Sequence, residues 1–155
     1  MAAQLDYGYS TPKGVAGGKV NLFHDEVITR MNEEENGVLK FGMAVMVGSK
    51  AGHTCKVAKG ATAEQIEGIA LCNPTTEFDM NGNVVVKKGA SIGVMKTGAI
   101  WARLATDVTP TYGAKAYVVV SGNDAGTFTT TASGNVDIGA KFGNETDDGI
   151  AIVIF

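Results

Sequence analysis

Cysteine and histidine, the residues that most often hold a structural metal ion, are scarce in this sequence. The two cysteines, Cys55 and Cys72, have no CxxC spacing, and His24 and His53 are the two histidines. These positions do not match the ligand patterns of zinc sites, so we predict no metal centre. We interpret the cysteines as reduced, partly buried thiols, because an unactivated thiol behaves as a small hydrophobic group. A disulfide between them would require Cα atoms within about 7 Å of each other.

Positive charge and long apolar runs are also lacking. Lys and Arg total 13 against 16 Asp and Glu, the net charge is −3, and no Lys/Arg block occurs. Such a chain cannot release many phosphate counterions, which removes the main source of affinity for nucleic acids. No apolar run approaches the roughly 18 residues of a transmembrane helix, and the opening MAAQLDYGYSTPKG lacks the apolar stretch of a secretory signal. We therefore expect no nucleic-acid partner and no membrane partner, and assembly in a cytoplasm.

Glycine is abundant, and it separates short apolar runs instead of gathering in one linker. The chain has 21 glycines and 3 prolines, and 45% of its residues are apolar. Runs rich in β-branched and aromatic residues between such breaks are typical of β-strands. They lie at residues 42–47, 53–57, 68–71, 84–86, 91–95, 99–104, 116–120, 127–131, 136–138 and 150–155, with a strand of mixed polarity allowed within 20–31. The sequence predicts a single all-β domain, either a β-barrel or a jelly-roll-like sandwich.

One short helix and an extended arm complete the predicted organisation. Thr62 is followed three positions later by Gln65, the spacing of a capping box, which predicts a helix of at most about two turns over Thr62–Glu67. Residues 1–19 carry several glycines and a proline and show almost no aliphatic periodicity. We interpret residues 1–19 as an extended N-terminal arm and residues 20–155 as the β-domain.

Two segments match the letters of catalytic or phosphate-binding motifs, but their context does not support the chemistry. Gly89–Gly93 fits G-x-S-x-G, which would make Ser91 a nucleophile, yet strand and turn follow where a nucleophile elbow requires a helix. Both histidines precede Ser91, whereas that fold places its histidine base later in the chain. Gly14–Val20 resembles a phosphate-binding loop but has one residue too few, and Val20 replaces the Ser or Thr that holds Mg²⁺. We predict no catalytic residue and no cofactor.

Side chains with carboxylate or amide oxygens gather in three places that have simpler structural interpretations. Asp79–Asn83 is as rich in oxygen ligands as a calcium loop, but Ala90 stands where the bidentate carboxylate belongs, which favours a tight β-turn. Glu145 with Asp147-Asp148 has the composition of an acid-base pair or a divalent-cation site. Neighbouring acidic residues on loops are usually solvated. We therefore interpret this group and the acidic run Glu33–Gly37 as solvent-exposed turns.

The chain between Leu39 and Phe128 carries a succession of short segments in a distinctive order. They are FGMAVMVG at 41–48, EGIAL at 67–71, VKKGASIGVM at 86–95, KTGAIWARL at 96–104, AYVVV at 116–120 and GTF at 126–128. Each segment alone is a general β-strand pattern. Their succession resembles the structural cement, or capsid decoration, protein family of tailed bacteriophages.

The resemblance implies a non-enzymatic virion protein on the outer surface of a phage capsid, assembled in the host cytoplasm. Its partner would be the phage major capsid protein, whose neighbouring subunits it would cement, and the family has no catalytic residues to transfer. Closed symmetric oligomers are common among soluble proteins, so we also expect self-association as a dimer or trimer. The candidate contact residues for the capsid or a neighbouring subunit are Leu5, Tyr7, Tyr9, Pro12, Trp101 and Tyr112.

Two other functional classes stay open at this stage. A receptor- or glycan-binding β-module could stack Trp101 or Tyr112 on a sugar, although Trp101 lies in a predicted strand and is better interpreted as a core or interface anchor. Such a module would bind on a glycan panel and would not bind capsids. A small hydrolase would need one serine or acid whose removal abolishes turnover.

Overall fold

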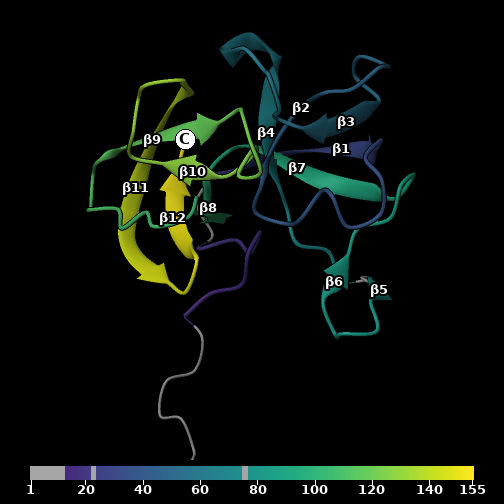
Figure 1. The fold of residues 1–155 in the computed structure, drawn as a ribbon, viewed down its shortest axis with the longest axis horizontal. Coiled ribbons are helices and arrows are strands. Elements are labelled where there is room, and N and C mark those ends of the chain that lie inside the picture. The colour runs from purple at the N-terminus through teal and green to yellow at the C-terminus, as the bar shows by residue number, and fades with distance from the viewer. Residues whose placement is uncertain (1–12, 22–23, 75–76) are drawn as a thin grey trace, which may run out of the picture.

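Two β-structures lie side by side in the chain, a closed barrel and a second five-stranded sheet (Figure 1). The computed structural model describes residues 13–21, 24–74 and 77–155. The barrel, in the strand order β1-β3-β2-β4-β7, consists of β1 (Glu26–Asn32), β2 (Ala44–Val47), β3 (Thr54–Val57), β4 (Ile66–Ala70) and β7 (Ser91–Thr97). The second sheet, in the order β10-β9-β11-β12-β8, consists of β8 (Ala99–Arg103), β9 (Lys115–Val119), β10 (Phe128–Thr129), β11 (Asn135–Asp147) and β12 (Ile150–Ile154). The prediction of an all-β fold with a barrel is confirmed.

Each run that the sequence analysis assigned to a strand contains or overlaps one. The predicted helix is a single 3-10 turn, η1 (Ala63–Gln65), and its capping box is present, with the Gln65 side chain accepting from the Thr62 amide at 3.0 Å. β11 is much longer than predicted, because register shifts after Asp137 and after Phe142 let the strand continue past the glycines that we interpreted as breaks.

A small hairpin, absent from both larger sheets, projects from the barrel (Figure 1). It pairs β5 (Glu77–Phe78), which the sequence analysis missed, with β6 (Val84–Val85). The Oδ1 atom of Asp79 accepts hydrogen bonds from the amides of Asn81 and Asn83 at 2.8 and 2.9 Å. The interpretation of this segment as a tight turn is confirmed.

The main core lies between the barrel and the second sheet and is built from residues of both. Successive side chains of a strand point to opposite faces, so only alternate residues of each strand enter this core. Ile100 and Ala102 of β8 therefore face the barrel, while Trp101 points the other way. Phe128 and Phe142 fill the middle of this core. A separate cluster fills the barrel interior and includes Cys55.

Both cysteines are free thiols in the structure. Cys55 is buried in the barrel, and burial raises the pKa of its thiol to about 12. Cys72 is only partly buried and packs against the same cluster. The two thiols are unpaired, and partial burial is correct for Cys72, whereas Cys55 is fully buried.

Residues 13–20 are packed against the second sheet, which corrects the end of the predicted arm. The Gly17 amide donates to the Trp101 carbonyl at 2.7 Å, and the Trp101 amide donates to the Gly18 carbonyl at 2.9 Å. A Cβ atom built on Gly14 would lie 2.2 Å from Cε2 of Trp101. The glycines of this segment thus allow its close approach to β8. Residues 1–12 lie outside the described residues, where the arm stays a prediction.

Candidate contact surfaces

Trp101 lies in the middle of β8 and is only 5% exposed. Its indole packs with Ile150 and Ile152 of β12 and is covered by Ala16 and Val20 of the N-terminal segment. The prediction of a core or interface anchor is thereby resolved as a core anchor inside the chain. The prediction that Trp101 contacts a partner is corrected, because the N-terminal segment of the chain itself covers the indole surface that a partner or a sugar would need.

Tyr112 is 79% exposed on the connection between β8 and β9. It borders a shallow hollow together with Lys141 of β11 and Ile154 and Phe155 at the end of β12. Ile154 is itself exposed and follows Ile152 at the two-residue spacing that places both on one face of the strand. Tyr112, Ile154 and Phe155 form what we call the C-terminal patch, an aromatic and aliphatic surface of the kind enriched at protein interfaces.

The structure does not place Trp101 and Tyr112 in one binding site. Trp101 is covered by residues 14–20, whereas Tyr112 borders an open hollow beside the end of β12. The remaining predicted contact residues, Leu5, Tyr7, Tyr9 and Pro12, lie outside the described residues.

The tip of the β5–β6 hairpin is a second exposed apolar surface, which the sequence analysis did not identify. Phe78, Met80 and Val84 are all exposed there. The turn is stiffened by Asp79, and the base of the hairpin is tied by an ion pair between Lys87 and Glu77. A signal was present in the sequence, since Phe78 and Met80 flank the turn residue Asp79, but which side chains of a hairpin stay exposed depends on the tertiary packing.

The acidic run after β1 is not simply a solvated turn, which corrects that interpretation. The Glu33 carboxylate accepts from the Ser49 amide and from the hydroxyls of Ser49 and Thr54. These hydrogen bonds, led by the one from the Ser49 side chain, lower the pKa of Glu33 to about 2. Glu34 in turn accepts from the Val57 amide at 3.1 Å. The run therefore fastens the end of β1 to the β2–β3 hairpin.

The second acidic group also has a structural role in part. Glu145 lies within β11, and Asp147 ends that strand. Asp147 accepts from the Lys13 amide at 2.8 Å through Oδ2 and from the Asp148 amide at 2.9 Å through Oδ1. These backbone hydrogen bonds, with that from Asp148 the larger cause, lower the pKa of Asp147. Asp147 thus anchors the start of the packed N-terminal segment.

The structure tests the nucleophile-elbow pattern at Ser91 directly. Ser91 begins β7, and the chain continues as strand to Thr97, so no helix follows the serine as an elbow would require. In the described part of the chain, no group of three or more His, Cys, Asp or Glu side chains is arranged to hold a metal ion.

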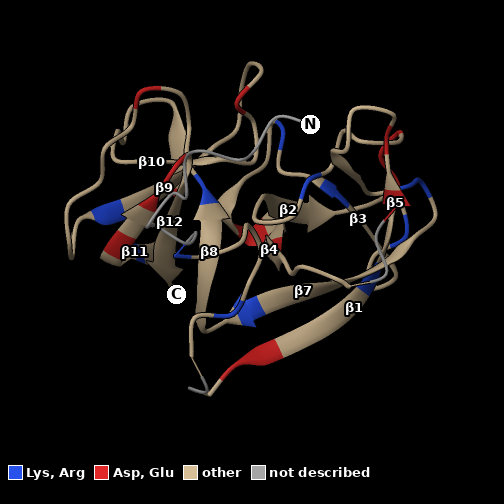
Figure 2. Cartoon of the chain, turned by 90° about the horizontal axis from the view of Figure 1, so that it is seen from below, with Lys and Arg blue, Asp and Glu red and all other residues tan. Residues whose placement is uncertain are grey.

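Charged residues are dispersed over the chain (Figure 2). Lys and Arg are interspersed with Asp and Glu along the ribbon, and several pair across strands, as Lys115 does with Asp137 at 3.1 Å and Lys96 with Glu26 at 3.5 Å. Among the described residues, no helix has the length and apolar character needed to cross a bilayer. Contact through shape and apolar surface is therefore better supported than electrostatic capture of a strongly charged partner.

Comparison with known proteins gives one family and one fold. The family model described as structural cement protein (E217 gp24/Pam3 gp6) matches residues 3–154. No curated protein sequence matches the chain significantly. Among solved structures, a chain of the capsid of Myoviridae Phage XM1 is similar, with a TM-score of 0.75 and 16% sequence identity, covering 99% of this chain and 97% of that one. At this identity the structural likeness establishes the fold, and the family model establishes the relationship.

Proposed function

Because the chain belongs to the structural cement protein family, we propose that it binds the outer surface of a phage capsid and cements neighbouring major capsid protein subunits. The family match over residues 3–154 is the observation that carries this proposal. The chain is a phage capsid-associated structural protein. We further propose that it acts without catalysis and assembles onto particles in the host cytoplasm.

The physical logic of cementing suits a small, rigid β-protein. A subunit that touches two capsid subunits gains from the high effective concentration of the second contact once the first has formed. The same gain repeats across the lattice, so modest individual surfaces are sufficient. The C-terminal patch, with Tyr112 at 79% exposure, offers a surface of this kind on the folded domain.

The N-terminal residues Leu5, Tyr7, Tyr9 and Pro12 are the second part of the proposed contact. An extended segment adds contact area with little folded mass, but ordering it on binding costs conformational entropy. The segment is useful only if its contacts offset that cost. Large apolar side chains such as those of Leu5, Tyr7 and Tyr9 are suited to do so.

Capsid occupancy tests the proposal. Purified undecorated capsids are incubated with the full chain, with a variant lacking residues 1–12, with Tyr112→Ala and with Lys59→Ala as an exposed-loop control, and bound protein is measured after sedimentation. We expect the full chain and Lys59→Ala to bind and to raise the temperature at which capsids disrupt. Shortening the chain or removing the Tyr112 ring should lower occupancy without changing the melting temperature of the free protein. A full chain that sediments no more than a protein unrelated to capsids would contradict the proposal.

A glycan-binding function is less well supported by the structure. It depended on Trp101 or Tyr112 as a stacking platform, and Trp101 is covered by the N-terminal segment. The exposed Tyr112 alone does not distinguish a sugar from a protein partner. We therefore propose the capsid as the ligand.

A further inference from the structure

The barrel is closed at β1 by only a short stretch of pairing. β1 pairs with β7 from Glu26 to Met31, but with β3 only at its last two residues. Alternate residues of a strand direct their backbone groups to opposite sides, and the Met31 amide donates toward β3, to the His53 carbonyl at 2.9 Å. Val27 and Thr29 share this direction, at positions where β3 is no longer alongside. The Asn32 amide donates to the Ala90 carbonyl on the β7 side, so by the same alternation the amides of Val27 and Thr29 point away from β7.

The face of β1 that points away from the barrel interior is apolar beside this free edge. Val27 is 39% exposed and Met31 is 42% exposed, with the exposed Thr29 between them. Open strand edges invite pairing with another chain, and proteins usually block them with charged side chains, prolines or bulges. An edge with outward-directed amides and exposed apolar neighbours has the features of a site for an added strand.

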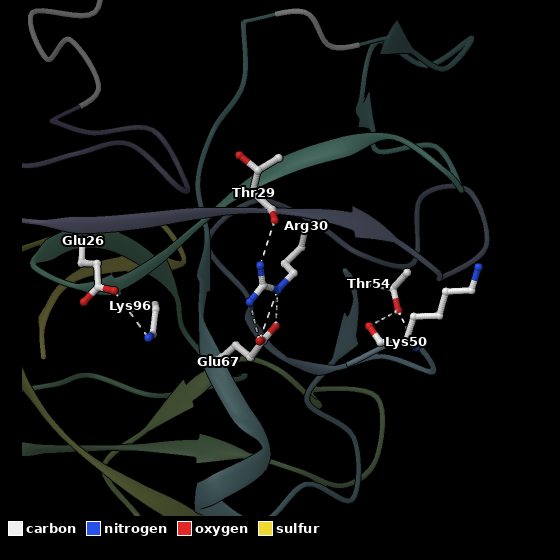
Figure 3. A network of polar contacts seen from close by, with 7 residues as sticks. All are labelled: Glu26, Thr29, Arg30, Lys50, Thr54, Glu67 and Lys96. Carbon is white, nitrogen blue, oxygen red and sulfur yellow. Dashed lines mark hydrogen bonds and ion pairs between the residues drawn. The ribbon is translucent and has the colours of Figure 1, made fainter. Parts of the chain in front are cut away.

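At the start of this edge lie the charged Glu26 and a register irregularity between Glu26 and Val27, and beyond them, within the described residues, a single side chain contacts the edge backbone. The Arg30 Nη1 group donates to the Thr29 carbonyl at 3.0 Å, and Glu67 of β4 holds the guanidinium through Nε and Nη2 at 2.9 to 3.2 Å (Figure 3). The hydrogen bond to Glu67 raises the pKa of Arg30. Arg30 therefore satisfies one carbonyl of the edge and donates nothing to the outward-directed amides of Val27 and Thr29, since its groups are donors.

We propose that the free edge of β1, residues 26–30, accepts the N-terminal segment of a second copy of this chain as an added strand. Residues 1–12 precede the anchored Lys13, and in an extended conformation they span at most about 40 Å. Leu5, Tyr7 and Tyr9 stand at alternate positions, which is the period of a strand with one apolar face. This segment therefore has both the length and the pattern that the edge requires.

The side chains of the two strands are complementary. With Leu5, Tyr7 and Tyr9 on the outer face, they pack across the strands on Val27 and Met31, since directly paired side chains in a sheet touch. The alternate residues then face the barrel interior. Asp6 is among them, and it brings a negative charge toward the guanidinium of Arg30.

The direction of the chain favours the β1 edge of a second copy, and not that of the same molecule, as the acceptor of the N-terminal segment. Residues 17–20 run antiparallel to β8, from the Trp101 carbonyl toward Ala99, and the chain then enters β1. Residue 13 is fixed to Asp147 beside the opposite end of β8. The first described residue, Lys13, therefore lies at the end of β8 away from β1, which favours a neighbour as the acceptor of residues 1–12 in this proposal.

The test measures the molar mass of the full chain by light scattering over a range of concentrations, without capsids. Thr29→Pro removes an amide that β7 does not use, so the internal ladder stays intact, while Thr29→Ala keeps the amide. We expect a concentration-dependent oligomer for the full chain and for Thr29→Ala, and at least a tenfold weaker association for Thr29→Pro with an unchanged melting temperature. Val27→Lys should weaken association similarly. Val84→Lys, at a matched exposure of 41% on the hairpin, should not.

A complementation experiment guards against misfolded variants. Thr29→Pro has a blocked edge and an intact segment, whereas a chain with Leu5, Tyr7 and Tyr9 all replaced by serine has the reverse. Each should be monomeric alone, and an equimolar mixture should form heterodimers. Unchanged association of Thr29→Pro, or a mixture that stays monomeric, would overturn the proposal.

Two further outcomes identify other occupants of the edge. A full chain that is monomeric at every concentration, but whose capsid occupancy falls with Thr29→Pro, would assign the edge to a capsid strand and overturn pairing between copies. If Thr29→Pro loses association between copies but still binds capsids, the proposal for the edge is supported and the proposed capsid function stands. The two hypotheses can therefore be refuted independently of each other.

Discussion

Replacement of Trp101 by alanine separates a structural role from a contact role. The indole is 5% exposed and packs on Ile150, Ile152, Ala16 and Val20. Truncation of a buried aromatic ring to alanine typically lowers the free energy of unfolding by about 3–5 kcal/mol. For a chain of this length each kcal/mol corresponds to about 2–4 °C in melting temperature, so Trp101→Ala should melt about 6–20 °C below the natural chain.

The assay is urea unfolding followed by far-ultraviolet circular dichroism, because Trp101 is the single tryptophan and its fluorescence is lost in the variant. Tyr112→Ala is the matched control, since the exposed ring should change stability by no more than about 0.5 kcal/mol. Trp101→Phe should fall between the natural chain and Trp101→Ala. An unfolding midpoint of Trp101→Ala equal to that of the natural chain would refute the packing of the N-terminal segment over the indole.

Four other predictions follow from the described contacts. Hydrogen bonds lower the pKa of Glu33 in the folded state from 4.5 to about 2, so the contribution of Glu33 to folding stability is complete above pH 4.5 and is lost as the pH falls through 2. Glu33→Gln should therefore make the melting temperature less dependent on pH over that window, and an unchanged pH profile would contradict the role of Glu33. Gly17→Ala should cost at least about 1 kcal/mol in urea unfolding, because Gly17 has φ +78° and an added Cβ would lie 2.8 Å from the Cys72 amide nitrogen. Gly52→Ala has the same φ and open space around it, so an equal loss in both would show that the close approach is unimportant. Deletion of residues 150–155 should give insoluble protein, because β12 lies between β11 and β8, and a soluble folded product would show that the strand is dispensable. The Cys55 thiol, buried and with a pKa of about 12, should react with a thiol reagent only on unfolding, as mass spectrometry of the labelled peptide can check.

The junction between the barrel and the second sheet explains why two glycines outside the strands are structurally important. Gly42 donates to the Ala70 carbonyl of β4 at 2.8 Å and accepts from the Arg103 amide of β8 at 2.9 Å. Gly17 bridges the same two structures, donating to Trp101 and accepting from Cys72. Both have φ near +80°, where a side chain is strained. The relative position of the two sheets therefore depends on backbone contacts as well as on the shared core.

Strand positions and the fold class could be predicted from the residues, because the signals for them are local. β-branched and aromatic runs separated by glycine specify strands wherever the chain places them, and the Asp79 turn and the Thr62–Gln65 capping box involve residues only a few positions apart. The family resemblance was also a matter of order along the chain. These features need no knowledge of which strands become neighbours.

The features that concern contact depend on residues distant in the chain. Burial of Trp101 under residues 14–20 and the fastening of Glu33 to the β2–β3 hairpin join segments whose partners no local pattern specifies. β11 continues through bulges because β9 and β12 hold it on both sides, although its glycines locally favour a break. The open edge of β1 exists because β3 ends its pairing after two residues, a consequence of barrel geometry. Local propensity thus identified the strands, while the competition for backbone partners in three dimensions determined which surfaces stayed available for binding.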